Sequence, residues 1–292
     1  MSEQIKLYKN RSIGERFSVV IDFLKQNWKV LYKNILPVGL PLAIILGYFL
    51  VQQTNAQLIS NLRNFYLIYF LFIIVSYMNI VYLYSMIGSI LVQYDRNQLT
   101  ETTGWKDLKD NFFRFFGKTI SISFIIFVPL IVIVSILAVF LTFWAAGASL
   151  TGSYLLVGVI ALLIIGAFIA FMPTFTILYF PAYFSGKNIL KSIKISVVLG
   201  FKNWGSLFLA IILTSIAFYI IYMIFSLPFI IVSVLSIGHV SIVMYILAIL
   251  STIGILLIYP VMILIFAFQY FSIVEKEEGV SLQSQVSEFE NL

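Results

Sequence analysis

Six long stretches without a charged residue constrain this chain more than any other feature of its sequence. A helix needs roughly 20 apolar residues to cross a bilayer core of about 30 Å. A soluble domain carries roughly a quarter charged residues, whereas this chain of 292 residues carries 10%. The sequence therefore predicts an all-α integral membrane protein with six transmembrane helices, at Ile35–Val51, Phe65–Tyr94, Thr119–Ala146, Tyr154–Phe184, Gly205–Val234 and Ser241–Val274.

The basic residues of the connecting segments predict the orientation. Lys and Arg close to span ends are held on the cytoplasmic side of a membrane. With six spans, Arg63 is the only Lys or Arg in the loops on one side, and the others fall in residues 1–34, 95–118, 185–204 and the tail 275–292. This bias predicts a protein of the bacterial cytoplasmic (inner) membrane with both termini in the cytoplasm.

A short pattern recurs before three of the spans. The segments "LKQNW", "LKDNF" and "GFKNW" each precede a span, and "ILVQY", "YFPAY" and "FAFQY" close the three units at Tyr94, Tyr183 and Tyr270. Internal repeats of this kind indicate a modular architecture. The chain is therefore predicted to be one membrane domain, 1–292, of three pseudo-repeats, 12–94, 100–184 and 188–272, with a cytoplasmic tail at 275–292.

Each pseudo-repeat opens with an amphipathic helix. In the first, Ser12 and Glu15 match a capping box at the helix start. A helix with an apolar stripe and a basic face lies stably in the membrane interface, where each Lys near anionic headgroups contributes about 1 kcal/mol. The candidate headgroup contacts are Lys25, Lys29, Lys33, Lys187, Lys191, Lys194 and Lys202, and the candidate interfacial anchors are Trp28, Trp105, Trp204, Tyr94, Tyr183 and Tyr270. Alternatively, these helices form a collar packed under the bundle, and their lysines only enforce orientation.

Few side chains could carry chemistry. Proton- and ion-coupled transporters usually place Asp, Glu, His or Arg at membrane depth, but the six spans contain none of these residues. Asn79 is a candidate intramembrane polar contact with a neighbouring helix. The chain has no Cys, and its single His, His239, has no neighbouring carboxylate, so we expect no metal site, no cofactor and no enzymatic activity. The net charge of +6 lies beside the spans, which argues against nucleic acid as a partner.

The "FLKxNW"-like amphipathic helix followed by paired spans resembles the membrane domain attached to some bacterial glycerophosphodiester phosphodiesterases. The stretch "QYFSIVEKEEGVSL" looks like the closing segment of stand-alone proteins of that group. The resemblance implies an all-helical protein of the cytoplasmic membrane. The phosphodiesterase barrel and its acidic residues are absent from this sequence, so the resemblance implies no catalytic role.

Two functions follow as hypotheses. The first is a non-catalytic scaffold or accessory subunit that engages anionic lipids, or a protein partner, through the cytoplasmic amphipathic helices. The alternative is a carrier or flippase-like protein for a neutral or lipidic substrate, with a cavity between the repeats. A polar cavity that reaches the middle of the membrane would favour the carrier, and a sealed apolar core would favour the scaffold.

Overall fold

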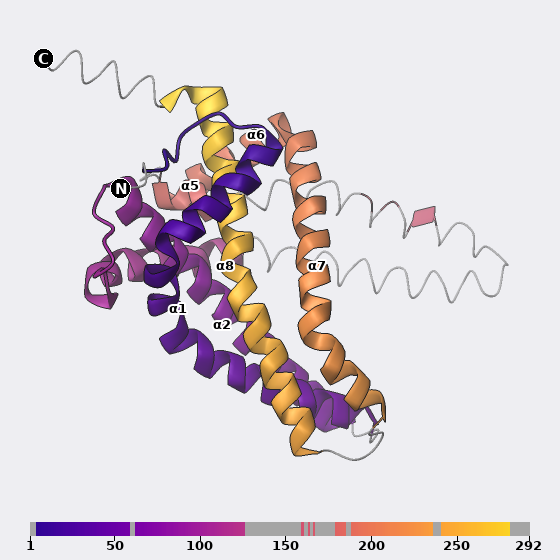
Figure 1. The fold of residues 1–292 in the computed structure, drawn as a ribbon. Helices are drawn as coiled ribbons and strands as arrows, with labels where there is room; N and C mark the ends of the chain where they lie inside the picture. The colour runs from indigo at the N-terminus through magenta and orange to yellow at the C-terminus, as the bar shows by residue number, and fades with distance from the viewer. Residues whose placement is uncertain are drawn as a thin grey trace, which may run out of the picture. The chain divides into compact units, whose positions relative to one another are not determined.

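The computed structural model describes residues 4–58, 62–125, 159–160, 163, 166, 179–184, 188–235 and 241–280. Every regular element within these residues is a helix (Figure 1). The helices are α1 (Ile13–Leu58), α2 (Leu62–Asp95), α5 (Tyr179–Phe184), α6 (Ile189–Lys202), α7 (Trp204–Leu235) and α8 (Ile242–Glu278), and the chain is also helical at 105–125.

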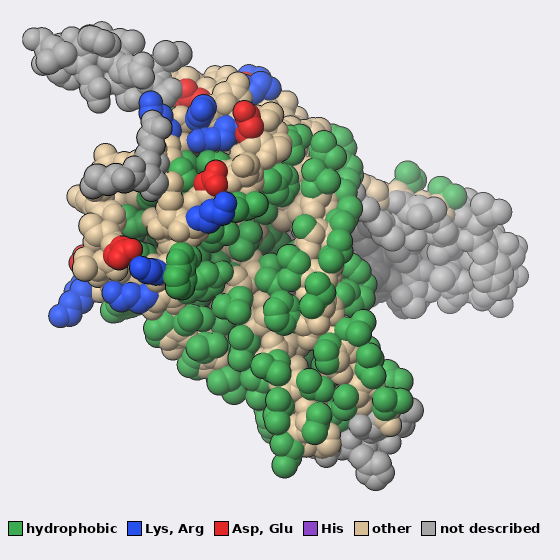
Figure 2. Space-filling model, viewed as in Figure 1, with side chains coloured by type: hydrophobic (Ala, Val, Ile, Leu, Met, Phe, Trp, Pro, Cys, Tyr) green, Lys and Arg blue, Asp and Glu red, His purple; other side chains and the backbone are tan. Residues whose placement is uncertain are grey.

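Four helices are long and apolar enough to cross a membrane, at Ile13–Thr54, Tyr66–Asp95, Trp204–Leu235 and Ile242–Glu278. Hydrophobic side chains cover much of the visible surface, as expected for helices that face lipid (Figure 2). The chain is therefore an integral membrane protein with multiple spans. The predicted spans Thr119–Ala146 and Tyr154–Phe184 lie largely outside the described residues.

Helix α1 joins the first predicted amphipathic helix and the first predicted span into one element of 46 residues. At 1.5 Å per residue it is about 69 Å long, and it changes direction along its length (Figure 1). Pro37 and Pro41 lie inside it. Proline has no N–H for the carbonyl four residues earlier, which bends a helix without ending it. The predicted amphipathic helix and the predicted span from Ile35 are thus two parts of one bent, continuous helix.

The chain divides into two compact units, and unit 1 comprises Met1–Phe116 and Leu209–Leu292. In unit 1, α1 packs along both α8 and α2. Helix α8 runs antiparallel to α1, since Phe23 contacts Phe268, Thr252 donates to the Ala43 carbonyl and Gln52 donates to Tyr245. The pairing extends over nearly the whole of α1.

Two parts of these three helices differ in burial. We call residues 13–34, 81–95 and 263–278 the charged-end bundle, and residues 35–54, 66–80 and 242–262 the apolar half. In the charged-end bundle, residues 81–92 of α2 and 263–274 of α8 are buried without interruption. The apolar half leaves many large side chains exposed, among them Ile44, Tyr48, Phe70, Ile73 and Ile246.

Unit 2 comprises Gly117–Phe208. Its described helices are joined by hydroxyl contacts, at 2.8 Å between Thr119 Oγ1 and Tyr183 Oη and at 3.2 Å between Ser123 Oγ and Tyr179 Oη. Helix α6 buries Ser192, Ser196, Leu199 and Gly200. Four of its larger apolar residues are exposed: Leu190, Val197, Val198 and Phe201.

Candidate functional site

A cavity of about 380 Å³ lies where the charged-end bundle meets the apolar half. Helix α1 supplies one wall, and α2 and the start of the helix at 105–125 supply the rest. The described lining residues are Lys33, Asn34, Pro37, Val38, Tyr82, Gly104 and Trp105. The cavity brings together one candidate headgroup residue, Lys33, and one candidate aromatic anchor, Trp105.

Hydrogen bonds within the protein satisfy the polar groups of the cavity wall. The Tyr82 hydroxyl donates to the carbonyl of Asn34 at 2.7 Å and to that of Ile35 at 3.2 Å. The Asn34 side chain donates to the carbonyls of Val30 and Thr103, at 2.8 and 3.3 Å. These bonds hold the α1 bend next to Pro37. They leave a predominantly apolar surface for a ligand.

The rim of the cavity is basic and aromatic. The Lys33 ammonium is exposed and donates to the Thr102 carbonyl at 3.5 Å. Lys29 is not among the lining residues, and its ammonium forms an ion pair with Glu101 at 3.4 Å. Trp105 is 44% exposed and packs edge-on against Phe112. The Lys33 ammonium beside an apolar groove bordered by Trp105 is complementary to a phospholipid, which has an anionic headgroup next to apolar acyl chains. Trp and Lys side chains are common at the depth of such headgroups.

The other candidate headgroup lysines do not share this cavity. Lys25 is exposed on α1 and lies 3.8 Å from Asp22 in an ion pair. On α6, the exposed lysines are Lys191, Lys194 and Lys202, and Lys187 lies outside the described residues. Because α6 also exposes four large apolar side chains, it offers the combination of basic and apolar surface that suits an interfacial helix.

Among the six candidate anchors, the tryptophans are more exposed than the tyrosines. Trp28 is 54% exposed, and Trp204 is half-buried with its ring stacked on Phe208. The three tyrosines at the unit ends, Tyr94, Tyr183 and Tyr270, are instead buried within the protein. Tyr94, for example, packs its ring against Phe23, and its hydroxyl accepts a hydrogen bond of 2.8 Å from the Ile5 N–H. The tyrosines therefore contribute to packing inside the protein.

The side chain of Asn79 is half-buried in α2. Its Oδ1 atom is buried and has no hydrogen-bond partner among the described residues, and the same holds for the hydroxyl of Tyr77. The contact predicted between Asn79 and a neighbouring helix is thus not formed within the described part of the chain, and it stays a prediction.

Two buried arginines were overlooked because the sequence presents them only as orienting charges. Arg11 and Arg16 are 6% and 5% exposed. Arg16 donates to Arg11 O at 2.9 Å, to Ser272 Oγ at 3.1 Å and to Gln269 Oε1. Burial lowers the pKa of Arg11, and the Glu15 carboxylate partly opposes that shift. The polar residues Gln269 and Ser272 in the apolar segment "FAFQYFS" were the available signal.

Comparison with known proteins gives no matching family model, no matching curated protein and no matching solved structure. Among the residues that the structure describes, no group of three His, Asp or Glu side chains could hold a metal ion.

Proposed function

We propose that this multi-pass membrane protein is a non-catalytic scaffold or accessory subunit that binds anionic phospholipid at its basic, Trp-bordered membrane interface. The observation that carries the proposal is the shared cavity of Lys33 and Trp105 at the border of the apolar half. An ammonium group at this level attracts an anionic headgroup, while Val38 and Trp105 offer apolar contact to the adjoining acyl chain.

The topology that we propose has six spans in three pseudo-repeats, with both termini in the cytoplasm. Matching positions in the three units support it. Leu31, Phe115 and Leu207 each lie four residues after the repeated Asn and are each at most 1% exposed. In addition, Asn27 and Asn203 each donate to the carbonyl four residues earlier, at 3.0 and 3.3 Å. The position four residues after the Asn is thus buried in all three units, and the Asn side chain makes the same helix bond in two of them.

A carrier for a neutral or lipidic substrate is the second candidate function. Among the described residues, the buried Oδ1 of Asn79 and the hydroxyl of Tyr77 have no hydrogen-bond partner, and they favour this function because an unpaired polar atom at membrane depth is costly. Such atoms could contact a polar part of a passing substrate. Movement of a fluorescent lipid between the two leaflets of vesicles that contain the protein would support the carrier. The absence of such movement would favour the scaffold.

Lipid retention by the purified full-length chain tests the proposed function. Native mass spectrometry would count the phosphatidylglycerol molecules that stay bound after release from nanodiscs of phosphatidylcholine and phosphatidylglycerol. We expect Lys33→Gln to weaken retention about fivefold, which corresponds to about 1 kcal/mol for one interfacial lysine. The matched control is Lys109→Gln, which removes the same charge from an exposed position outside the cavity.

The two variants distinguish lipid binding in the cavity from non-specific attraction of anionic lipid to surface lysines. A loss confined to Lys33→Gln supports binding in the cavity. Equal losses in both variants, or no loss in either, would show that the cavity does not bind the headgroup, and the lipid-binding role proposed for it would be wrong.

A further inference from the structure

A non-helical segment precedes α1 and is tied to the ends of α2 and α8. The Ile5 N–H donates to the Tyr94 hydroxyl at 2.8 Å, and the Gln4 side chain donates to the Tyr94 carbonyl at 3.2 Å. Further along, Tyr8 packs edge-on against Phe271, with 5.1 Å between ring centroids. Leu7 is buried as well. The segment is therefore held in a defined position.

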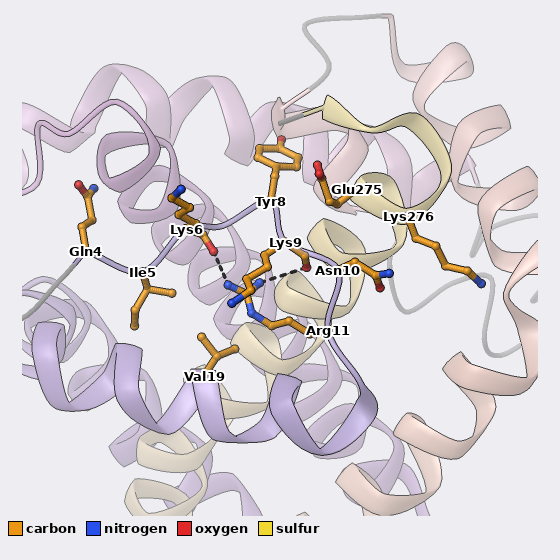
Figure 3. A pocket seen from close by; sticks show the side chains of 10 residues that line it. All are labelled: Gln4, Ile5, Lys6, Tyr8, Lys9, Asn10, Arg11, Val19, Glu275 and Lys276. Carbon is orange, nitrogen blue, oxygen red and sulfur yellow. Dashed lines mark hydrogen bonds between the residues drawn. The ribbon is translucent and has the colours of Figure 1, made fainter. Parts of the chain in front are cut away.

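Arg11 fixes the shape of this segment. Its guanidinium donates to the carbonyls of Lys6 and Lys9, the latter at 3.4 Å (Figure 3), and also to the Leu7 carbonyl at 3.0 Å. Its backbone is held by Ser272, whose hydroxyl accepts from the Arg11 N–H at 3.0 Å and donates to the Arg11 carbonyl at 3.2 Å. Arginine stays protonated even when buried. A permanent positive charge is thus built into the loop that carries Lys6 and Lys9.

A cavity of about 690 Å³ lies between this segment and the end of α8 (Figure 3). Among its described lining residues, Lys6, Lys9, Arg11 and Lys276 are basic, and Glu275 is the single carboxylate. The three lysines are exposed, so a ligand can reach them, whereas Arg11 is buried. The charges of the wall therefore favour an anion over a cation.

We propose that this cavity binds a phosphate group. Several ammonium groups around one cavity suit phosphate, because each phosphate oxygen can accept more than one charge-assisted hydrogen bond. Because the Arg11 guanidinium already donates to three carbonyls, it attracts the phosphate through its positive charge only. The lysines make the direct contacts with the phosphate. The loop is ordered by the protein itself, so little conformational entropy is lost on binding. The phosphate belongs either to a soluble phosphate ion or to a phospholipid headgroup.

Two arms of one experiment distinguish these sources. In the first, inorganic phosphate is titrated into the full-length protein in an uncharged detergent, against a chloride blank of equal ionic strength, and binding is followed by calorimetry. In the second, native mass spectrometry measures phosphatidic acid retained from phosphatidylcholine nanodiscs. Binding in the first arm identifies a soluble phosphate site, and binding only in the second identifies a phosphomonoester headgroup.

The decisive variant is Lys6→Gln with Lys9→Gln. We expect it to weaken binding about tenfold in the arm where wild-type protein binds, because hydrogen bonds to charged groups are lost. The control, Lys106→Gln with Lys109→Gln, removes the same charge at exposed positions outside the cavity and should leave binding within about twofold of wild type. Lys276→Gln, which leaves the segment itself unchanged, should lower binding in the same arm.

Two results would overturn the proposal. One is that wild-type protein binds neither probe, and the other is that the control weakens binding as much as the Lys6 and Lys9 variant does. The Lys33→Gln variant separates this inference from the proposed function, because Lys33 lines the other cavity. Its effect on phosphatidylglycerol retention does not depend on phosphate binding at the N-terminal segment.

Discussion

The charged-end bundle and the apolar half use the same three helices but pack them differently. In the charged-end bundle, residues 263–274 of α8 are buried on every side, whereas in the apolar half Ile246 and Leu250 of the same helix are about half exposed. Water drives apolar side chains to be covered, but lipid tails are as apolar as the side chains themselves and exert no such force. An uncharged run of sequence can therefore be a protein core over one part of its length and a lipid-facing span over another.

The two regions also use different side chains at their contacts. Aromatic rings fill the charged-end bundle, where Phe23 and Phe271 both pack against Phe268. In the apolar half, Gly47 allows the backbones of α1 and α8 to approach closely, since a Cβ on Gly47 would lie 2.7 Å from the Ile249 Cα. Small residues at helix contacts are typical of packing in lipid.

The largest effect should come from a truncation in the charged-end bundle. Phe268→Ala removes a fully buried ring, and we expect it to lower the free energy of unfolding by about 3–5 kcal/mol because a cavity remains. Ile246→Ala, at a side chain that is 52% exposed in the apolar half, should change it by only about 0.5 kcal/mol. Equilibrium unfolding in mixed micelles measures both. Similar losses would contradict the division into a protein core and a lipid-facing half.

An intermediate effect is expected where two helices touch in the apolar half. Gly47→Ala should lower the free energy of unfolding by about 1–3 kcal/mol, since the new methyl group meets the α8 backbone and the helices must separate. The control is Gly14→Ala near the start of α1, where an added Cβ meets nothing within 4 Å. This change should raise stability by up to about 1 kcal/mol, because alanine restricts the unfolded chain. A stabilising Gly47→Ala would refute close backbone packing at this position.

The sequence predicted the local features well. The helical membrane class follows from apolar runs and is confirmed by the four long apolar helices. The capping box is confirmed as well, because the Ser12 N–H donates to the Glu15 carboxylate at 2.7 Å and the Glu15 N–H donates to the Ser12 hydroxyl at 3.4 Å. Both features depend on residues close together in the chain.

The features that escaped prediction depend on contacts between distant segments. Arg16 is buried because Gln269 and Ser272, more than 250 residues away, accept its hydrogen bonds. Phe23 and Trp28 are both aromatic residues of the first amphipathic helix, yet Phe23 is fully buried and Trp28 is 54% exposed. A helix in a membrane protein can direct one apolar side toward protein and another toward lipid, and periodicity alone does not distinguish them.

The smallest effects are expected from the loss of a single hydroxyl donor in each region. They again compare the charged-end bundle with the apolar half. Tyr82→Phe removes the hydroxyl that donates to the carbonyls of Asn34 and Ile35 beside the bend of α1. Thr252→Val removes the hydroxyl that donates to the Ala43 carbonyl at 2.7 Å in the apolar half. Both replacements keep the shape of the side chain. Equilibrium unfolding in mixed micelles is again the measurement.

We expect Tyr82→Phe to lower the free energy of unfolding by about 1–2 kcal/mol, because buried carbonyls lose a hydrogen-bond donor. Thr252→Val should lower the free energy of unfolding by only about 0.6 kcal/mol. When α1 and α8 separate within lipid, the Thr252 hydroxyl can still donate to a carbonyl of its own helix. Thr252 already donates to the Ala248 and Ile249 carbonyls at 3.2 and 2.9 Å. If Thr252→Val proved the more damaging change, the bond between α1 and α8 would be a principal support of the apolar half, and close backbone contact would not suffice to explain its packing.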